Sequence, residues 1–412
     1  FVGLAARNPP ISSSVTTNSR FRLVSMIQDW NVTPLERLED YQSPPARALE
    51  WILSVETIDW NGEVNSLKEK FALATLFFAT QSTPNTNDDN SSWTNSDNWL
   101  STTQSICSWY GITCTHDAAG NTQRIRRLDL SLNGLVSSIP AEVSLLNLES
   151  LGLHSNALTG TIPLELYRMV DLAYLYLDNN HLSGRIDSAI GNLTSLVDLR
   201  ISGNMLTGPI PAEIENMSLL QIVYIDGNAI SGVLPSEALA KMMLLHEFQF
   251  HDNIIGGTLP QALERLKMLR ILYCDGNLLF GAIPNGLGQL TRLEALFLFD
   301  NQISGPIPQS FAQLTELQEF QVHENTLSGP VWEDVIGAWT NLQILRLHNN
   351  SFDGGVPNAL ADLNDLKIVQ LHGNAFVGTV PNVLCNSTEL DILTSDCGDR
   401  VECSCCTQCF HH

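Results

Sequence analysis

The stretch LRLHNNSFDGGVP at residues 345–357 is followed 24 residues later by VQLHGNAFVGTVP at residues 369–381. The same spacing, occasionally 23 or 25 residues, recurs through most of the chain. A fixed period of this length is typical of solenoids, in which each repeat is one supersecondary unit. One asparagine marks each of eleven consecutive repeats: Asn133, Asn156, Asn180, Asn204, Asn228, Asn253, Asn277, Asn301, Asn325, Asn350 and Asn374.

Each repeat has a physical interpretation. Apolar residues alternate with polar ones before the asparagine, which predicts a short parallel strand with one buried face. The asparagine amide can turn inward and hydrogen-bond backbone groups of the coil, so the stacked amides should form a ladder. The following glycine suits a tight bend, and Ile-Pro or Val-Pro predicts an extended flank. Because no repeat buries its apolar edge alone, both ends need caps.

The pattern LxxLxLxxNxLxGxIP over about residues 125–381 resembles the plant-type leucine-rich-repeat family. The resemblance implies an α/β solenoid, a superhelix with a parallel β-sheet on its concave face. Three repeats depart from the pattern: Ser137 replaces the glycine, and Asp187 and Trp332 each replace the proline. These departures leave open the flank geometry of repeats one, three and nine.

The segment before the repeats has the features of a cap. Apolar positions in residues 43–81 recur at helical spacing. They are followed by CSWYGITC, in which Cys107, Trp109, Gly111 and Cys114 match the CxWxGxxC element of plant-type leucine-rich-repeat ectodomains. That resemblance implies a Cys107–Cys114 disulfide. The whole chain, including the closing DCGDRVECSCCTQC, is similar to diatom leucine-rich-repeat receptor-like proteins.

We therefore predict five segments along the chain. They are a flexible leader at 1–20, a helical N-terminal cap at 21–124, eleven repeats at 125–381, a cysteine-rich C-terminal cap at 382–410, and a tag remnant at 411–412.

The nine cysteines separate into a front pair, a lone residue and a rear cluster. Cys274 occupies an inward strand position and is expected to be a small buried hydrophobe. The rear cluster is Cys385, Cys397, Cys403, Cys405, Cys406 and Cys409. Four thiolates could hold zinc, but the CxCCxxC spacing is unlike paired zinc motifs and favours three disulfides of open connectivity. Neighbouring Cys405 and Cys406 should not pair with each other.

Several features indicate an extracellular protein. Six N-x-S/T sequons fit a secreted, glycosylated chain: Asn31, Asn90, Asn192, Asn216, Asn349 and Asn386. The formal charge of −23 argues against nucleic acid and anionic membrane surfaces as partners. The longest apolar run, at 71–79, is shorter than the about 20 residues that span a bilayer. Membrane attachment is therefore expected only through an anchor beyond the C-terminal cap.

Outward strand positions predict where a ligand could bind, because solenoids usually bind on their concave sheet. One patch mixes aromatic rings, which supply contact area, with carboxylates, which fix orientation. It consists of Tyr176, Asp178, Tyr224, Asp226, Tyr273, Asp275, Phe297 and Phe299. The alternative is that these aromatic residues only pack against one another on an exposed sheet face.

A second patch places His323, His348 and His372 in consecutive repeats, with Glu319 and Glu324 alongside. Strand spacing would make these imidazoles near neighbours. They could coordinate a metal or make binding depend on pH. The alternative, surface histidines without a role, is the simpler one.

No catalytic motif is present, so we expect neither an enzyme nor a cofactor. The resemblance implies the ectodomain of a single-pass surface receptor that binds a peptide, glycan or protein partner, with a possible co-receptor, on the concave face or flank. A secreted inhibitor of an extracellular hydrolase, similar to polygalacturonase inhibitors, and a wall or adhesion component are the alternatives.

Overall fold

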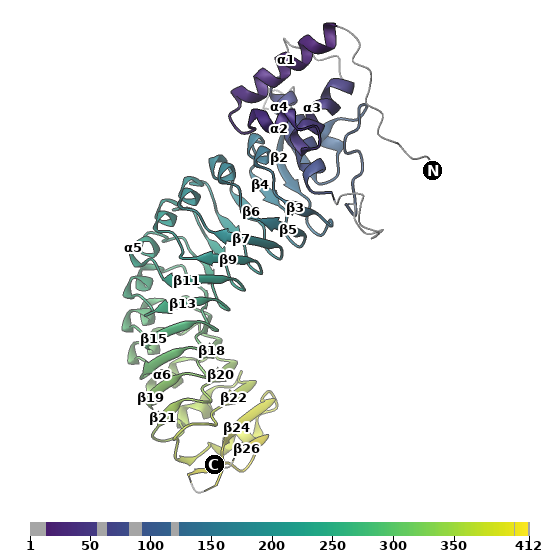
Figure 1. The fold of residues 1–412 in the computed structure, drawn as a ribbon. Coiled ribbons are helices and arrows are strands. Elements are labelled where there is room, and N and C mark those ends of the chain that lie inside the picture. Colours follow the sequence, from purple (N-terminus) through teal and green to yellow (C-terminus); the bar gives the residue numbers. More distant parts are fainter. Residues whose placement is uncertain (1–13, 56–63, 82–92, 117–122, 399, 411–412) are drawn as a thin grey trace. The chain divides into compact units, whose positions relative to one another are not determined.

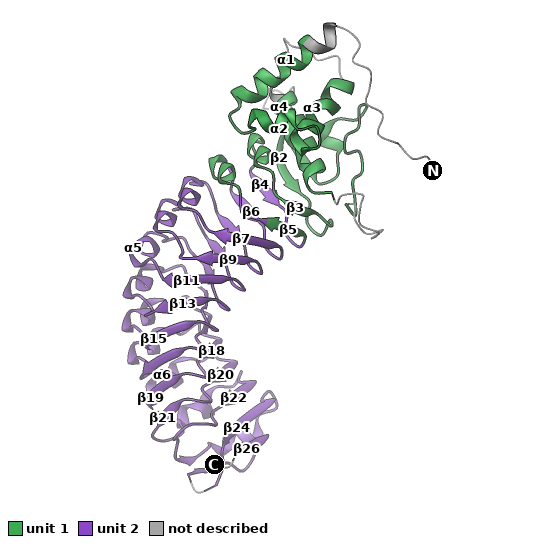
Figure 2. Ribbon diagram, in the orientation of Figure 1, with its two compact units in different colours: residues 1–148, 156–159, 163–169 green, residues 149–155, 160–162, 170–412 purple. Residues whose placement is uncertain are grey.

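The chain forms two compact units, which Figure 2 colours separately. Unit 1 comprises residues 1–148, 156–159 and 163–169, and unit 2 comprises residues 149–155, 160–162 and 170–412. The computed structural model describes residues 14–55, 64–81, 93–116, 123–398 and 400–410. The predicted tag remnant at 411–412 lies outside the described residues.

The helices of unit 1 are α1 (Ser14–Asp29), α2 (Leu35–Glu39), α3 (Pro44–Val55) and α4 (Val64–Ala79) (Figure 1). Residues 14–20 were expected in a flexible leader but are helical. Leu23 and Ile27, one turn apart on α1, are fully buried, and Arg20 pairs with Glu50 of α3 at 3.0 Å. Burial and this ion pair therefore order α1 from Ser14. The rest of the expected leader lies outside the described residues.

Aromatic residues after α4 form a small core in unit 1. The rings of Trp93 and Trp99 lie 4.6 Å apart, and those of Trp99 and Trp109 lie 5.2 Å apart. All three indoles are buried, and Trp93 Nε1 donates to Thr80 Oγ1 at 3.0 Å. Phe77 of α4 lies 5.0 Å from the Trp93 ring and 5.9 Å from the Trp99 ring, so ring packing joins this core to α4.

The CxWxGxxC motif builds a turn between η1 (Ile106–Ser108) and β1 (Ile112–His116). Cys107 and Cys114 form a disulfide. Gly111 has a φ of 79°, and a Cβ there would lie 2.2 Å from the Asp129 carbonyl oxygen. Only glycine fits this close approach. β1 then pairs antiparallel with β2 (Gln123–Asp129).

Unit 1 also contains β3 (Val136–Ser138), η2 (Ala141–Leu145), most of β5 (Ala157–Gly160) and η3 (Leu164–Arg168). Glu142 of η2 is fully buried, where an unpaired carboxylate would be costly. Its Oε1 accepts from Thr33 Oγ1 at 2.8 Å and from Arg37 Nη1 at 3.2 Å. Thr33, between α1 and α2, and Arg37 of α2 thus partner one oxygen of this carboxylate, whereas its Oε2 has no hydrogen-bond partner among the described residues.

Unit 2 is a stack of coils whose strands form a parallel sheet, here called the concave sheet, on the inner side of the curve (Figure 1). Its strands, in spatial order, are β4 (Ser150–Gly152), β6 (Tyr174–Tyr176), β8 (Asp198–Arg200), β10 (Ile222–Tyr224), β12 (Glu247–Gln249), β14 (Ile271–Tyr273), β16 (Ala295–Phe297), β18 (Glu319–Gln321), β20 (Ile344–Arg346), β22 (Ile368–Gln370), β24 (Ile392–Asp396) and β26 (Gln408–Phe410). The middle residue of each three-residue strand of this sheet from β4 to β22 is buried, so the predicted parallel solenoid is confirmed.

A second parallel sheet follows the asparagines of unit 2. Its strands are β7 (His181–Arg185), β9 (Met205–Gly208), β11 (Ala229–Val233), β13 (Ile254–Gly257), β15 (Leu278–Ala282), β17 (Gln302–Gly305), β19 (Thr326–Pro330) and β21 (Ser351–Asp353). The repeat pattern predicted a tight bend at the glycine and an extended flank at the Ile-Pro or Val-Pro that follows, but no second sheet. Neighbouring coils lie close enough for these flanks to pair with one another.

Short helices complete most coils of unit 2. They are η4 (Ser188–Asn192), η5 (Ala212–Asn216), α5 (Ser236–Leu239), η6 (Gln261–Arg265), η7 (Asn285–Gln289), η8 (Gln309–Gln313), α6 (Glu333–Ala338), η9 (Asn358–Asp362) and η10 (Asn382–Asn386). Two of them begin where the sequence departs from the repeat. Asp187 replaces proline and caps η4 by accepting from the Ala189 amide at 2.8 Å, and Trp332 precedes α6. In unit 1, Ser137 has a φ of 63° and adopts the bend expected of glycine.

The predicted asparagine ladder is present. Asn253 Nδ2 donates to the carbonyl oxygens of Ile225, Phe250 and His251, each at 3.1 Å. Its Oδ1 accepts from the Ile230 amide at 2.9 Å. One side chain thus satisfies four backbone groups that the turn would otherwise leave buried without partners.

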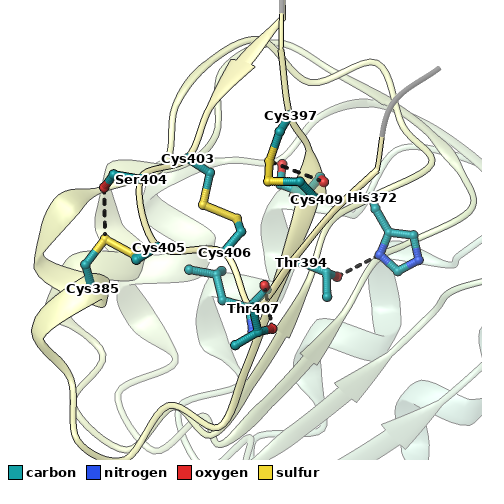
Figure 3. The surroundings of a disulfide bond; sticks show 12 residues. His372, Cys385, Thr394, Cys397, Cys403, Ser404, Cys405, Cys406, Thr407 and Cys409 are labelled. Carbon is teal, nitrogen blue, oxygen red and sulfur yellow. Dashed lines mark hydrogen bonds between the residues drawn. A yellow bond between two sulfur atoms is a disulfide. The ribbon is translucent and has the colours of Figure 1, made fainter.

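Three disulfides form the C-terminal cap (Figure 3): Cys385–Cys405, Cys397–Cys409 and Cys403–Cys406. The sulfur atoms of Cys397, Cys406 and Cys409 lie within 4.8 Å of one another. All three belong to disulfides, whereas zinc binds thiolates. A short pairing of β23 (Gly378–Thr379) with β25 (Val401–Glu402) completes the cap.

Candidate functional site

The outward residues of the concave sheet lie in register from strand to strand. Tyr224 of β10 is paired with Gln249 of β12, Gln249 with Tyr273 of β14, and Tyr273 with Phe297 of β16. The repeat register therefore brings together side chains that are about 24 residues apart in sequence. The predicted aromatic residues are half-buried rather than freely exposed, because side chains on neighbouring strands cover them in part.

The first part of this surface holds a guanidinium between two phenol rings. Arg200 makes a two-point contact with Asp198, from Nε to Oδ1 and from Nη2 to Oδ2, each at 3.0 Å. Its Cζ lies 5.3 Å from the Tyr176 ring centroid and 4.8 Å from that of Tyr224, which allows cation–π attraction. Tyr176 Oη donates to Asp198 Oδ2 at 3.0 Å.

The two tyrosines of this group are held in their neutral form. Burial raises the pKa of Tyr176 to about 12, and the Asp198 carboxylate adds to the rise. Burial and the hydrogen bond that its hydroxyl donates to Glu247 raise the pKa of Tyr224. Both hydroxyls therefore stay hydrogen-bond donors at neutral pH. Asp198 was not among the predicted site residues, although it lies two positions before Arg200 in the same strand.

The second part is a pair of stacked rings. The centroids of Tyr273 and Phe297 lie 4.0 Å apart with an interplanar angle of 9°. Phe299 belongs to the next column and stacks on His323 at 4.4 Å instead. In the predicted aromatic patch, Tyr176 and Tyr224 thus flank Arg200, whereas Phe297 is in ring contact with both Tyr273 and Phe299. Both ligand contact and mutual packing remain compatible with this arrangement.

The three predicted aspartates have different surroundings. Asp178 Oδ2 accepts from Asn179 Nδ2 at 2.9 Å. Asp226 accepts from the Ser202 hydroxyl and lies 3.6 Å from His251 Nε2. Asp275 is only 5% exposed, and its Oδ1 has no hydrogen-bond partner among the described residues. Burial raises the pKa of Asp275 to about 6, while His251 opposes the rise.

The predicted histidine patch is a continuous stack of rings. His323 and His348 lie 4.3 Å apart, His348 and His372 lie 4.6 Å apart, and Phe410 of the C-terminal cap covers His372 at 3.9 Å. Figure 3 shows His372 beside the cap, with its Nδ1 2.7 Å from Thr394 Oγ1.

This stacking bears on both suggested roles of the histidines. Face-to-face rings do not converge on one point, and the three are not among the described groups whose ligand atoms lie within 4.8 Å of one another. Burial lowers the pKa of His323 to about 4 and that of His348 to about 3, and the Arg346 charge adds to both shifts. Glu319 accepts from Gln321 Nε2 at 3.1 Å, and Glu324 lies exposed in the following turn.

The remaining predicted positions lie away from this surface or beneath it. Cys274 is fully buried and is the free cysteine among the described residues, and burial raises its pKa well above the usual value. Asn90 lies outside the described residues. The other sequon asparagines are exposed: Asn31, Asn192, Asn216, Asn349 and Asn386.

Comparisons with known proteins agree with this architecture. The Leucine Rich Repeat family model matches residues 171–193, 195–217, 292–314 and 341–363. A plant peptide hormone receptor, RGFR1 in complex with RGF2, is 31% identical, with a TM-score of 0.63 over 67% of this chain and 44% of that chain. The Arabidopsis receptor kinase HAESA, in complex with the peptide hormone IDA and the co-receptor SERK1, is 30% identical, with a TM-score of 0.61 over 65% and 45%.

A third structure is similar over the same share of the chain. The leucine-rich-repeat ectodomain of the Arabidopsis thaliana receptor kinase GASSHO1/SCHENGEN3, in complex with CASPARIAN STRIP INTEGRITY FACTOR 2, is 30% identical, with a TM-score of 0.61 over 68% of this chain and 35% of that chain. The chain therefore spans less than half the length of these receptor chains. Within the described residues, no helix combines the length and apolarity needed to cross a bilayer.

Proposed function

Because the chain carries the leucine-rich repeats of the plant receptor ectodomains that it resembles, we propose that it is the extracellular ligand-recognition ectodomain of a receptor-like surface protein. The ligand is a peptide or an exposed segment of a partner protein. In this proposal, residues 125–381 form the binding repeats, and residues 21–124 and 382–410 form the caps. The proposal assigns no catalytic step to the chain.

The observation that carries the proposal is the outward face of β6 to β16. Aromatic rings lie there on β6, β10, β14 and β16, and in the first three cases a carboxylate follows two residues beyond the ring. Rigid rings supply contact area at low entropic cost, and carboxylates fix the orientation of donor groups. Similar receptors in complex with peptide hormones favour a peptide over a glycan.

The compartment and the attachment are part of the same proposal. Four disulfides fit an oxidising, extracellular environment. We propose a single membrane anchor encoded downstream of the C-terminal cap, and a co-receptor as a second partner. The gene sequence that follows residue 410 tests the anchor: about 20 apolar residues are expected.

An unbiased interaction screen of the secreted chain tests ligand binding, and a double variant locates the site. Tyr224→Ala with Tyr273→Ala should weaken binding of a ligand found in the screen by at least about tenfold, because two ring contacts are lost. The matched control is Val233→Ala with Phe280→Ala, whose side chains are 63% and 52% exposed on the second sheet. We expect this control to bind as the parent does.

Two outcomes would count against the concave site. Full affinity in the Tyr224/Tyr273 double variant would move the site away from these rings. Loss of binding only in the Val233/Phe280 double variant would place it on the second sheet. Circular dichroism melting of both double variants checks that the fold is retained.

A further inference from the structure

Two consecutive groups of side chains on the concave sheet each begin and end with a tyrosine. Tyr224 is the tyrosine that the two groups share. The first group, the first bracket, is Tyr176, Asp198, Arg200 and Tyr224. The second group, the second bracket, is Tyr224, Glu247, Gln249 and Tyr273. Strand pairing places Arg200 between its two tyrosines and Gln249 between its own two in the same register.

The two brackets use the same contacts. Tyr176 donates its hydroxyl to Asp198, and Tyr224 donates its hydroxyl to Glu247. Each carboxylate lies two residues before the central side chain of its bracket, on the same face of the same strand. The brackets differ at the centre, where Arg200 in the first corresponds to Gln249 in the second. The first bracket is filled by the chain's own cation, and the second is not.

Glu247, which carries the charge of the second bracket, forms no salt bridge in the described part of the chain, although its charge adds to that of Glu294 in raising the pKa of Arg270. Glu247 accepts from a neutral phenol, and none of the salt bridges involves Glu247, Asp275 or Glu319. The neighbouring Arg270 is bound to Glu294 by two hydrogen bonds of 2.7 and 2.9 Å. The carboxylates of Glu319, Asp275 and Glu247 add to the effect of burial in raising the pKa of Tyr273, so all three act on this ring.

Asp275 supplies an independent observation beside the bracket. It lies two residues after Tyr273, is 5% exposed, and has an Oδ1 that accepts no hydrogen bond among the described residues. A buried carboxylate oxygen without a donor is costly. His251 and the carboxylates of Asp226 and Asp252 are its titratable neighbours. Because this oxygen is shielded from solvent, Asp275 adds negative charge beside the bracket rather than a contact point for the ligand.

We propose that the second bracket is a subsite for a guanidinium or ammonium group, supplied by an arginine or lysine side chain of the ligand. The inference rests on the proposed function and adds a chemical class to it. The ligand cation lies on the outer side of Gln249, which holds the central position, beside Glu247 and against the Tyr224 and Tyr273 rings. Charge-assisted hydrogen bonds and the ring faces then stabilise it together.

The chain offers a variant that fills the subsite from within. Gln249→Arg should place a guanidinium in the second bracket as Arg200 lies in the first, and so exclude a ligand cation. Gln370→Arg is the matched control. Gln370 lies in the same column on β22, so this substitution adds the same charge to the sheet at a position that no pair of tyrosines flanks. The probes are N-acetyl-L-argininamide and its uncharged counterpart N-acetyl-L-citrullinamide, titrated by ligand-observed NMR.

We expect the arginine probe to bind the parent chain at least about tenfold more tightly than the citrulline probe, because charge supplies much of the contact. Gln249→Arg should weaken arginine binding by about tenfold or more, while Gln370→Arg should change it by less than about twofold. Equal binding of the two probes, or undiminished arginine binding by Gln249→Arg, would overturn the subsite.

The same variants separate this inference from the proposed function. A screened ligand that depends on Tyr224 and Tyr273 but binds Gln249→Arg with full affinity would leave the proposed function standing and remove the subsite. Arginine binding that Gln249→Arg abolishes, together with a screen that finds no ligand, would leave the subsite standing and remove the proposed function.

Discussion

His323 and His348 are neutral at physiological pH because of the rings on the neighbouring strands. Each imidazole lies between two other rings, so water is excluded from both faces, and the positive charge of Arg346 opposes protonation further. Two protonated rings 4.3 Å apart would also repel each other. The stack therefore favours a rigid, uncharged surface over a switch between pH 5 and 8.

This arrangement predicts a loss of stability in mild acid. The unfolded chain protonates these imidazoles as the pH falls through about 6.5, whereas the folded chain protonates His323 only near pH 4 and His348 only near pH 3. The unfolded state binds more protons in that window, so the free energy of unfolding decreases as the pH drops, by on the order of 2 kcal/mol. Thermal melts at pH 7, 5.5 and 4 measure the decrease.

A variant that keeps aromatic rings at these two positions separates the effect of histidine protonation from that of ring packing. His323→Phe with His348→Phe retains the stack but cannot take up protons, so its melting temperature should depend less on pH. His181→Phe, an exposed position on β7, serves as the control and should keep the parent's dependence. An unchanged dependence in the double variant would assign the acid sensitivity to other groups.

At the scale of elements, the three-residue strand β26 forms the C-terminal edge of the concave sheet. It pairs with β24 through Thr394, Ser395 and Asp396, and its Phe410 covers the last imidazole of the histidine stack. The Cys397–Cys409 disulfide joins the end of β24 to β26. A three-residue edge strand has little stability of its own, so the covalent link holds the cap in place.

Removing this disulfide should loosen the cap locally. Cys397→Ser with Cys409→Ser is expected to cost about 2 to 4 kcal/mol in cap stability. Hydrogen exchange should then increase in residues 401–410 and around His372, but little near β10. Equal protection in the parent and the variant would show that packing of Val401 and Phe410 suffices. Intact-mass analysis of the unreduced parent should find one free thiol, that of Cys274.

At the scale of the whole molecule, the exposed sequons leave the outward strand positions free. Asn192 and Asn216 are the last residues of η4 and η5, Asn386 is the last residue of η10, and Asn349 lies in a turn after β20. Asn31 follows α1. Glycans at the four positions in unit 2 would extend from turns and helix ends, and not from the strands that carry the rings of β6 to β16.

We therefore predict N-linked glycans on the chain secreted from a eukaryotic host. Glycosidase treatment in heavy-oxygen water should convert occupied asparagines to labelled aspartates, and peptide mapping should locate them at Asn192, Asn216 and Asn386. Enzymatic removal of the glycans should leave ligand affinity within about twofold, because these side chains lie off the concave strands. Complete absence of label at the exposed sequons would contradict the prediction.

The 24-residue period, the asparagine column and the CxWxGxxC motif were enough to predict the solenoid, its amide ladder and its N-terminal cap. These features are local, since each repeat contains all the residues that define its own coil. The connectivity of the rear cysteines, the second parallel sheet and the placement of Arg200 between the Tyr176 and Tyr224 rings depended on the tertiary structure. The same is true of the buried state of Asp275 and the neutral histidines. The sequence alone determined which residues face outward, whereas only the tertiary structure decided what stands beside them, because the neighbours of each side chain come from the next turn of the solenoid.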